Sequence, residues 1–315
     1  MALSGIALVT GGAGFIGSHI GATLAQSGAK VRIIDDLSTG YQSNIDAIGS
    51  QVEFVKANVA DERALHKALS DVELVFHEAA IPSVPRSVDR PAESHRASVD
   101  ATFNLLLAAR DQKVRRVIYA ASSSAYGDQP ELPKREDMRP APLSPYAVGK
   151  LVGEYYCQVF THVYGLETVS LRYFNVFGPR QDPTSQYSGV ISRFMSALMT
   201  GAQPVIYGDG EQSRDFTYIS NVVDANMRAA ESAAASGEII NIANARRTTL
   251  NELLETMKKV TGRSSVTARH EPPRAGDVRD SLADLTRART LLGYQPRVNL
   301  EDGLRLTFEW WKKNN

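Results

Sequence analysis

Short runs of apolar and β-branched residues recur along the first two thirds of the chain, and stretches with helical periodicity lie between them. Strands that are buried on both faces of a parallel sheet form continuous apolar runs, and their alternation with helices is typical of βαβ units. We therefore predict an α/β fold with a doubly wound parallel sheet, whose strands cover residues 6–9, 31–34, 52–55, 74–77, 117–120, 168–171 and 238–242.

The pattern changes after Phe174. The segment 178–183 (GPRQDP) interrupts any regular element, and helical periodicity returns at residues 190–199, 250–261 and 300–311. We interpret these later elements as a smaller C-terminal α/β lobe, inserted after the sixth strand and after the seventh. The expected division is one domain of residues 1–177 with 218–243 and a second of residues 178–217 with 244–315. A ligand site should lie over the carboxyl ends of the strands, where open α/β sheets bind ligands.

The composition is that of an ordinary globular protein, with 43% hydrophobic and 22% charged residues among 315. Lysine and arginine number 35, as do aspartate and glutamate, so no excess of charge favours nucleic acid or an anionic membrane as a partner. The single cysteine, Cys157, excludes an internal disulfide and argues against a cysteine-based metal site. No stretch has the pattern of a signal peptide or a membrane span. We therefore expect a cytoplasmic enzyme or binding protein that holds no metal.

Between the first predicted strand and a helical stretch lies the glycine-rich segment 10–17 (TGGAGFIG). Gly11 permits a sharp turn, Gly14 lets the backbone approach a pyrophosphate, and Gly17 lets the helix lie close to the sheet. Free N–H groups at the helix N-terminus would then face a phosphate. A glycine-rich turn without a ligand is the alternative, but the strand before it and the helix after it favour a dinucleotide site of the Rossmann type.

Asp35 stands at the end of the second predicted strand, about twenty residues beyond the glycine turn. A carboxylate at this place accepts hydrogen bonds from the adenosine ribose hydroxyls and repels the 2′-phosphate of NADP. A solvated carboxylate in a loop is the alternative, because Asp36 and Ser38 follow. With the glycine turn in place we predict NAD as the cofactor, since Arg32 would have to swing round to accommodate NADP.

Tyr146 and Lys150 are four residues apart at the start of an apolar helical stretch, so they share one helix face. An ammonium beside a phenol favours the phenolate, and we expect it to lower the pKa of Tyr146 toward that of a general base. The segment 119–127 (YAASSSAYG) ends the fifth predicted strand and brings serine hydroxyls to the same sheet edge. A chance Tyr/Lys pair and an ordinary serine-rich turn are the alternatives.

The glycine turn, the serines before Tyr126-Gly127 and the Tyr146/Lys150 pair together resemble the extended short-chain dehydrogenase/reductases. The segments 172–180 (RYFNVFGPR), 208–216 (GDGEQSRDF) and 274–277 (RAGD) are similar to the branch of that family that modifies nucleotide sugars. In the family's order, the motifs run from residue 10 to residue 284 and so cover nearly the whole chain.

The resemblance implies a role for each matching residue of the cofactor site. Tyr146 would take the proton from the sugar hydroxyl, Lys150 would hold the nicotinamide ribose and tune the phenol, and Ser122 would hydrogen-bond the same hydroxyl. The implied NAD contacts are Gly11, Gly14, Phe15, Ile16, Gly17, Asp35, Asp36, Asn58, Val59, Ala79, Ala80, Ser98, Tyr146, Lys150 and Tyr173.

The resemblance also implies a UDP-sugar site. Asn175 and Arg214 would meet the diphosphate, which suits the planar donor fork of arginine. Arg274 would hold phosphate and Asp277 the uridine ribose, with a surface ion pair as the alternative for these two residues. Val190 and Tyr207 would line the uracil pocket. The implied substrate contacts are Ser83, Ser122, Ser123, Ser124, Asn175, Val190, Tyr207, Arg214, Arg274, Asp277 and Ser281.

Departures from the family pattern narrow the choice among the family's reactions. Asn58 replaces an Asp beside the adenine, and Ser98 and Ala101 replace the usual Asn and Gly beside the nicotinamide, which weakens one cofactor contact and removes no catalytic group. Ser123 and Ser124 occupy the positions where the family's dehydratases and decarboxylases carry acids. The resemblance then implies reversible hydride transfer at C4 through a 4-keto sugar, with NAD regenerated in each cycle. We expect a UDP-sugar 4-epimerase.

The preferred sugar depends on pocket size. Ser281 resembles a position where a tyrosine restricts the pocket near C2 in some 4-epimerases, and serine leaves room for an N-acetyl group. The segments 83–87 (SVPRS) and 181–183 (QDP) are also similar to the subgroup that prefers N-acetylhexosamines. We expect UDP-N-acetylglucosamine/UDP-N-acetylgalactosamine, with UDP-glucose/UDP-galactose as a further pair. UDP-glucuronate 4-epimerase and an inactive NAD-sensing protein are the alternatives. By resemblance, the helical stretches 101–109 and 146–164 would pair in a homodimer.

Overall fold

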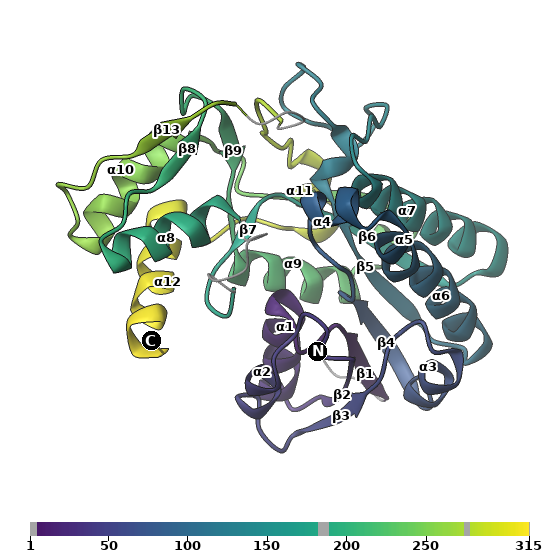
Figure 1. The fold of residues 1–315 in the computed structure, drawn as a ribbon. Coiled ribbons are helices and arrows are strands. Elements are labelled where there is room, and N and C mark those ends of the chain that lie inside the picture. Colours follow the sequence, from purple (N-terminus) through teal and green to yellow (C-terminus); the bar gives the residue numbers. More distant parts are fainter. Residues whose placement is uncertain (1–4, 182–188, 274–277, 315) are drawn as a thin grey trace.

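The structure is a computed structural model and describes residues 5–181, 189–273 and 278–314. Its centre is a seven-stranded parallel sheet with the strand order β11-β6-β5-β4-β1-β2-β3 (Figure 1). Each predicted strand is confirmed, with ends that differ by at most two residues. The strands are β1 (Ile6–Thr10), β2 (Lys30–Asp35), β3 (Val52–Lys56), β4 (Val72–His77), β5 (Arg116–Ser122), β6 (Glu167–Tyr173) and β11 (Ile239–Ile242).

Helices cover both faces of this sheet (Figure 1). Helices α3 (Glu62–Ala68), α6 (Ala101–Asp111) and α7 (Pro145–Tyr164) pack on one face, and α1 (Phe15–Gln26) and α9 (Ile219–Glu231) on the other. Because side chains alternate along a strand, each strand contributes to two apolar layers, and this explains the continuous apolar runs of the sequence. Shorter helices on this part of the chain are α2 (Gln42–Asp46), α4 (Val84–Asp89) and α5 (Pro91–His95), and α11 (Thr286–Leu292), from later in the chain, contacts β11.

The order of the strands reverses between β1 and β4. Open sheets of this kind bind ligands at the reversal, beyond the carboxyl ends of the strands. The turns that follow these two strands are joined there, because the Ala79 amide donates to Thr10 Oγ1 at 3.2 Å and the Glu78 amide donates to the Thr10 carbonyl at 3.2 Å. The fold therefore brings the glycine turn beside the residues that follow β4.

A smaller lobe, coloured green to yellow in Figure 1, lies to one side of the sheet. Its helices are α8 (Val190–Thr200), α10 (Leu250–Thr261) and α12 (Leu300–Asn314), which confirm the three helices predicted there. Two small sheets accompany them: β8 (Val205–Tyr207) pairs in parallel with β13 (Arg269–Glu271), and β9 (Ser213–Asp215) pairs antiparallel with β12 (Arg247–Thr249). No helix in the described ranges has both the length and the apolar character needed to cross a membrane.

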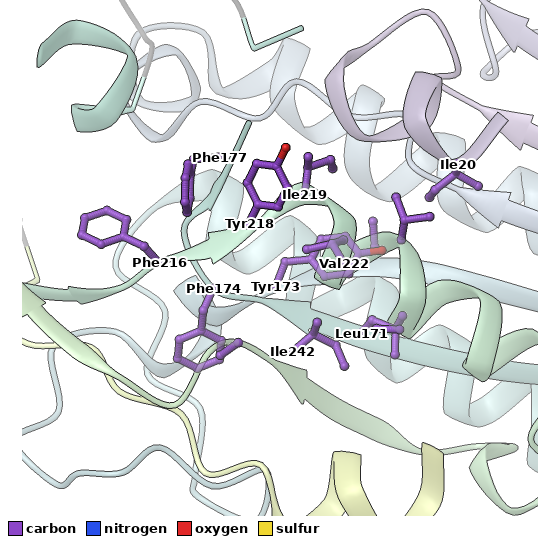
Figure 2. Close-up of a cluster of buried hydrophobic side chains, with 14 of the residues drawn as sticks. Ile20, Leu171, Tyr173, Phe174, Phe177, Phe216, Tyr218, Ile219, Val222 and Ile242 are labelled. Atoms are coloured by element: carbon purple, nitrogen blue, oxygen red, sulfur yellow. The ribbon is translucent and has the colours of Figure 1, made fainter. Parts of the chain in front are cut away.

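An apolar cluster connects the sheet to this lobe (Figure 2). The short strands β7 (Val176–Phe177) and β10 (Thr217–Tyr218) pair in parallel, and the Phe177 and Tyr218 rings lie 5.6 Å apart in an edge contact. Helix α12 approaches both rings closely, since a Cβ atom at Gly303 would lie 2.8 Å from each. Burying such side chains stabilises a fold by about 1.5–3 kcal/mol each, so this cluster fixes the lobe against the sheet.

A buried ion pair joins β6 to α7. Arg172 on β6 donates from Nε to Glu154 Oε1 at 2.8 Å and from Nη2 to Oε2 at 2.7 Å. The side chains are 2% and 0% exposed, and the guanidinium lies 4.7 Å from the centre of the Tyr126 ring. Glu154 stands one helical turn beyond Lys150 on α7, so the pair supports the helix that carries the predicted catalytic residues.

Candidate active site

The glycine turn has the geometry of a phosphate-binding loop. Gly11 has a φ of 66°, and a Cβ atom there would lie 2.7 Å from the Ala79 nitrogen. At Gly17 a Cβ atom would lie 2.3 Å from the Gly11 carbonyl oxygen, so both positions require glycine. Helix α1 begins after Gly14 with no side chain capping it. Its first N–H groups are therefore directed to a ligand position, with Phe15 and Ile16 in the first turn.

Asp35 is a fixed, buried part of this turn and not a solvated loop carboxylate. It accepts hydrogen bonds from the Ala13 amide at 3.0 Å and the Leu37 amide at 2.8 Å, and burial raises its pKa. Arg32 points elsewhere: its guanidinium donates to Glu53 Oε2 at 2.7 Å and to the Ala68 carbonyl at 2.8 Å. Because Arg32 is held on another part of the sheet, it does not offer the cation that NADP would need.

The residues predicted to lie beside the adenine form a hydrogen-bonded group. Asn58 donates from Nδ2 to Asp36 Oδ2 at 2.7 Å, and its Oδ1 accepts from the Ala60 amide at 2.8 Å. The Asn58 side chain is thus engaged through both its oxygen and its nitrogen. Val59, next to it, is buried.

Tyr146, Ser122 and Lys150 come together at the carboxyl end of β5. Ser144 caps α7 by accepting from the Ala147 amide at 3.2 Å, which sets Tyr146 in the first turn and Lys150 one turn later. The Ser122 hydroxyl hydrogen-bonds with the Tyr146 phenol. Ser124 donates from Oγ to Ser122 Oγ at 2.9 Å, while Ser123 lies between them in the short 3₁₀ turn after β5.

One sequence-based expectation is wrong here: the pKa of Tyr146 is raised, not lowered. Burial is the largest cause, and the charge of Glu78 adds to it, whereas the hydrogen bond from Ser122 acts in the opposite direction. The Lys150 ammonium is turned to the backbone instead, since Nζ donates to the Ala120 carbonyl at 2.6 Å. Spacing on a helix places two side chains on one face, but it does not report desolvation or competing acceptors.

Glu78 is a residue of this site that the sequence analysis missed. It follows β4 directly, and its Oε1 accepts a hydrogen bond from the Tyr173 hydroxyl at 2.9 Å. Burial raises the pKa of Glu78 to about 7, while the Tyr173 hydrogen bond and the Lys150 charge lower it. Burial also lowers the pKa of Lys150 to about 8, and Glu78 opposes that shift. The only sequence signal was an acidic residue directly after a predicted strand.

Ser98 lies in an irregular part of the helix next to α7. It belongs to a π-helical turn, Arg96–Asp100, between α5 and α6, and such turns often occur at functional sites. Its hydroxyl is buried without a hydrogen-bond partner, and a Cβ atom at Gly149 would lie 2.9 Å from Ser98 Cβ. This orphaned hydroxyl, the glycine cradle and the carboxylate ending β2 are the features that a nicotinamide dinucleotide would use. Ala79 and Ala80 follow Glu78 and are half-buried.

The predicted diphosphate residues meet at β9. Asn175 has a φ of 34° and donates from Nδ2 to the Asp215 carbonyl at 3.1 Å. Arg214 donates from Nη1 to the Ser213 carbonyl at 2.9 Å and to the Arg279 carbonyl at 3.3 Å. Asn175 is thus tied to the end of β9 at Asp215, and Arg214 to the carbonyls of Ser213 and Arg279. The predicted residues Arg274 and Asp277, and residues 182–183 of the QDP segment, lie outside the described part of the chain.

The segment 279–284 runs between the lobe and the sheet. The Ser281 amide donates to the Ser213 carbonyl at 3.2 Å, and the Asp284 amide donates to the Lys134 carbonyl at 2.9 Å. Ser281 is 9% exposed, and its hydroxyl is buried without a partner. The structure therefore places a small residue with an unsatisfied hydroxyl beside β9. Ser83, by contrast, uses its hydroxyl to cap α4, accepting from the Arg86 amide at 3.1 Å.

A cavity of about 290 Å³ opens in the lobe and is lined by Tyr207, Gly208, Asp209, Gln212, Pro273, Val278 and Arg279. Tyr207 is the residue predicted to line a uracil pocket. Arg279 and Asp209, both in the cavity lining, form a bidentate ion pair with N–O distances of 3.0 and 3.1 Å. Val190, the other predicted uracil contact, is half-buried at the start of α8.

Helix α1 is also tied to the segment that follows β7. His19 donates from Nε2 to the Pro179 carbonyl at 3.0 Å, and Arg180 donates from Nη1 to the Ser18 carbonyl at 3.0 Å. Burial lowers the pKa of His19 to about 4, so the ring is neutral at pH 7 and keeps this bond. The helix whose N-terminus is predicted to face a phosphate is thus fixed to the chain that leads into the lobe.

Known proteins resemble this chain over its whole length. Residues 7–243 match the model of the NAD dependent epimerase/dehydratase family. The chain is 40% identical over 313 residues to the UDP-glucose 4-epimerase of Mycolicibacterium smegmatis, covering 98% of this chain and 99% of that protein. The solved structure of UDP-N-acetylglucosamine 4-epimerase from Methanobrevibacter ruminantium M1, in complex with UDP-N-acetylmuramic acid, is similar with a TM-score of 0.94 and 39% identity, covering 100% of both chains. That of UDP-glucuronic acid 4-epimerase from Bacillus cereus, in complex with UDP-glucuronic acid and NAD, has a TM-score of 0.91 and 33% identity, covering 98% of this chain and 100% of that one.

Proposed function

The chain belongs to the NAD-dependent epimerase/dehydratase family, and from this premise we propose that it interconverts UDP-N-acetylglucosamine and UDP-N-acetylgalactosamine. It is a nucleotide-sugar 4-epimerase that uses NAD. The pair UDP-glucose/UDP-galactose is included in the proposal as a second substrate pair. Residues 1–177 with 218–243 would hold the NAD, and residues 178–217 with 244–315 would hold the UDP-sugar.

In the proposed reaction Tyr146 takes the proton from the 4-hydroxyl of the sugar and later returns it. Bound NAD supplies the hydride acceptor and then the donor. Ser122 would orient the same hydroxyl, since its own hydroxyl already pairs with the Tyr146 phenol. The Lys150 ammonium would hold the nicotinamide ribose. Because the ring of the 4-keto sugar turns about its diphosphate linkage between the two transfers, Asn175 and Arg214 must hold the diphosphate while the sugar moves.

The observation that carries the 4-epimerase assignment is the composition of the site around Ser122. Its neighbours Ser123 and Ser124 offer hydroxyls and no carboxyl group, and Ser124 is itself hydrogen-bonded to Ser122 at 2.9 Å. Loss of water from C6 would require a further acid and base at the sugar. Within the described residues, Glu78 is the acidic group that interacts electrostatically with Tyr146, and its carboxyl is held by Tyr173. The site therefore supports proton transfer at C4 and not the elimination of water from C6.

The proposal for an N-acetylated sugar rests on Ser281. A buried hydroxyl without a partner is costly by about 1–3 kcal/mol unless a ligand satisfies it, and the carbonyl of an N-acetyl group is a suitable acceptor. A tyrosine at this position would fill the space that the serine leaves. Selectivity between sugars should therefore depend on the size of this side chain.

The test is turnover of a panel of UDP-sugars, with products separated by chromatography. We expect conversion of the N-acetylated pair, and a Ser281→Tyr variant should lose that conversion by about tenfold or more relative to the plain pair, about 1.4 kcal/mol of discrimination. Equal loss on both pairs would contradict the role of Ser281. Turnover of UDP-glucuronate alone would replace the proposed substrate with that sugar.

A Tyr146→Phe variant separates catalysis from cofactor binding. We expect it to bind NAD as the wild type does and to lose turnover by about a hundredfold or more, because general acid–base catalysis typically contributes a rate factor of this size. A wild-type chain that binds NAD and converts no UDP-sugar would instead indicate a protein that senses NAD.

We also propose that the chain forms a homodimer through α6 and α7. The solvent side of α7 carries Val148, Tyr155, Val159 and Val163, each between 46% and 60% exposed. These positions follow helical spacing and form one apolar stripe, which is typical of a helix that packs against a partner. Light scattering after size-exclusion chromatography should give twice the 34.4 kDa of the chain, and a Val159→Glu variant should give the monomer mass.

A further inference from the structure

A buried network of hydrogen bonds leads from β1 through β4 to α6, and the proposed chemistry does not use it. Its centre is His77, the last residue of β4, which lies opposite Thr10 in the register of β1 and β4. The His77 Nδ1 atom lies 2.8 Å from Thr10 Oγ1, and Nε2 lies 3.0 Å from Thr102 Oγ1 on α6. All three side chains are buried. Apolar side chains would fill this space without the cost of burying polar atoms, so the network calls for a specific role.

The positions of the protons in this network follow from its hydrogen-bond partners. The Ser98 carbonyl can only accept, so the single hydroxyl proton of Thr102 is used in its 2.6 Å bond to Ser98. Thr102 Oγ1 must then accept from His77, which places a proton on Nε2. Burial lowers the pKa of His77 to about 3, and the Lys150 charge adds to this shift, so the ring is neutral and Nδ1 is an acceptor. The Thr10 hydroxyl therefore donates to Nδ1.

Each end of the network holds a residue that is predicted to contact NAD. At the β1 end, Thr10 Oγ1 accepts from the Ala79 amide at 3.2 Å, and Ala79 lies against the glycine turn, since a Cβ atom at Gly11 would be 2.7 Å from its nitrogen. At the α6 end, Thr102 holds the carbonyl of Ser98 in the π-helical turn. The Ser98 hydroxyl is buried without a partner, so the network ends beside a group that a ligand would satisfy.

We propose that His77 is a positioning residue for NAD, which as the neutral Nε2–H tautomer fixes Ala79 and Ser98 through one hydrogen-bond network. The other tautomer would draw the Thr102 proton to Nε2 and break the bond between Thr102 and the Ser98 carbonyl. The two ends are thus set together, and a cut at one end frees the ring to reorient at the other. This role rests on the proposed NAD contacts of Ala79 and Ser98.

Calorimetric titration of the full chain with NAD tests the α6 end. Thr102→Val keeps the shape of the side chain and removes its hydroxyl, so NAD affinity should fall by about three- to thirtyfold. Thr102→Ser keeps the hydroxyl, and its affinity should lie within about twofold of the wild type. A folded Thr102→Val variant that binds NAD as the wild type does would overturn the proposal.

The matched control for Thr102→Val is Thr307→Val on α12 in the lobe. The buried Thr307 hydroxyl also donates to the carbonyl four residues earlier, that of Gly303, at 2.7 Å. This variant should lower the melting temperature and leave NAD affinity unchanged. An equal loss of NAD affinity in the two variants would reduce the Thr102 effect to general destabilisation and would overturn the proposal.

The link through the ring is tested by combining Thr10→Val with Thr102→Val. If His77 couples the ends, the loss of NAD affinity in the double variant should be at least about twofold smaller than the product of the two single losses. Losses that multiply would overturn the coupling. If the NAD affinities change as expected while no UDP-sugar is turned over, the proposed function fails and the positioning role stands.

A second measurement needs no NAD. In the full-length protein labelled with ¹⁵N-histidine, the nuclear magnetic resonance signals of His77 should show an unprotonated Nδ1 and a protonated Nε2 from about pH 6 to about pH 9. These signals are identified by their loss in His77→Gln, or by their shift in Thr102→Ser where the first variant does not fold. A protonated Nδ1, or a ring that titrates in this range, would overturn the tautomer and with it the proposal.

Discussion

Replacing Arg172 with methionine should destabilise the fold more than any change at the protein surface. The side chain is 2% exposed, and it makes both of its charged hydrogen bonds to Glu154, which is 0% exposed. Methionine fills similar space but leaves the Glu154 carboxylate buried without its cation. Removing one partner of a buried pair typically costs about 3–5 kcal/mol, because an uncompensated charge remains in the interior.

The loss in the free energy of unfolding caused by Arg172→Met should depend on pH in a defined direction. Burial already raises the pKa of Glu154, and Arg172 is the main group that opposes this. Without Arg172 the pKa in the folded state rises further above its unfolded value. A carboxyl with a raised folded pKa contributes stability below its unfolded pKa, and this contribution is lost as the pH rises through the folded pKa. Arg172→Met should therefore be less destabilised at pH 5 than at pH 8.

Urea unfolding followed by circular dichroism at both pH values gives the free energies of unfolding. The matched control is the double variant Arg172→Met/Glu154→Met, in which neither charge remains. We expect it to recover about 2 kcal/mol or more of the loss, since apolar replacement of a complete buried pair is often neutral or stabilising. A single variant that loses under about 1 kcal/mol, or a double variant less stable than the single one, would refute this account.

Two further predictions concern the cofactor. Gly17→Ala should weaken NAD binding by about five- to a hundredfold in calorimetry, because its Cβ atom would lie 2.3 Å from the Gly11 carbonyl oxygen and relieving such a contact costs about 1–3 kcal/mol. The control is Gly189→Ala, where the nearest atom is 3.9 Å from the added Cβ. Equal affinities of Gly17→Ala and the wild type for NAD would show that the turn adapts to the added methyl group. In the wild type NAD should raise the melting temperature more than NADP does, and Asp35→Ser should narrow that difference by removing the carboxylate that repels a 2′-phosphate. An unchanged difference in Asp35→Ser would move the discrimination to another residue.

The strands and most helices could be predicted because local burial leaves a periodic trace in the sequence. A strand such as β5 is apolar on both sides, and a helix such as α10 carries a capping box at Thr249 and Glu252 and ends at Gly262 with a left-handed φ of 69°. Two features left no such trace. The π-helical turn at Arg96–Asp100 has the composition of an ordinary helix, and the two-residue strands β7 and β10 depend on contacts between segments about forty residues apart.

For the site, residue types were predictable and their electrostatics were not. The sequence indicated that Tyr146 and Lys150 share a helix face, and the structure puts Tyr146 beside Ser122 and the Lys150 ammonium at the Ala120 carbonyl. It could not indicate that burial would outweigh the effect of the ammonium, because desolvation depends on every element that closes over the phenol. Glu78 was missed for the same reason: a single acid after a predicted strand has no periodicity, and its environment depends on neighbours on β6 and α7.

The two hydrogen bonds that join α1 to Pro179 and Arg180 have a thermodynamic consequence. Any swing of this helix that widens the entrance to the pyrophosphate position must first separate it from the chain leading into the lobe. If the dinucleotide binds at this turn as proposed, its release by such a movement would require both of these hydrogen bonds to break. Retention of NAD suits the proposed reaction, in which the cofactor is regenerated in each turnover. Its loss between the two hydride transfers would leave the 4-keto sugar unreduced.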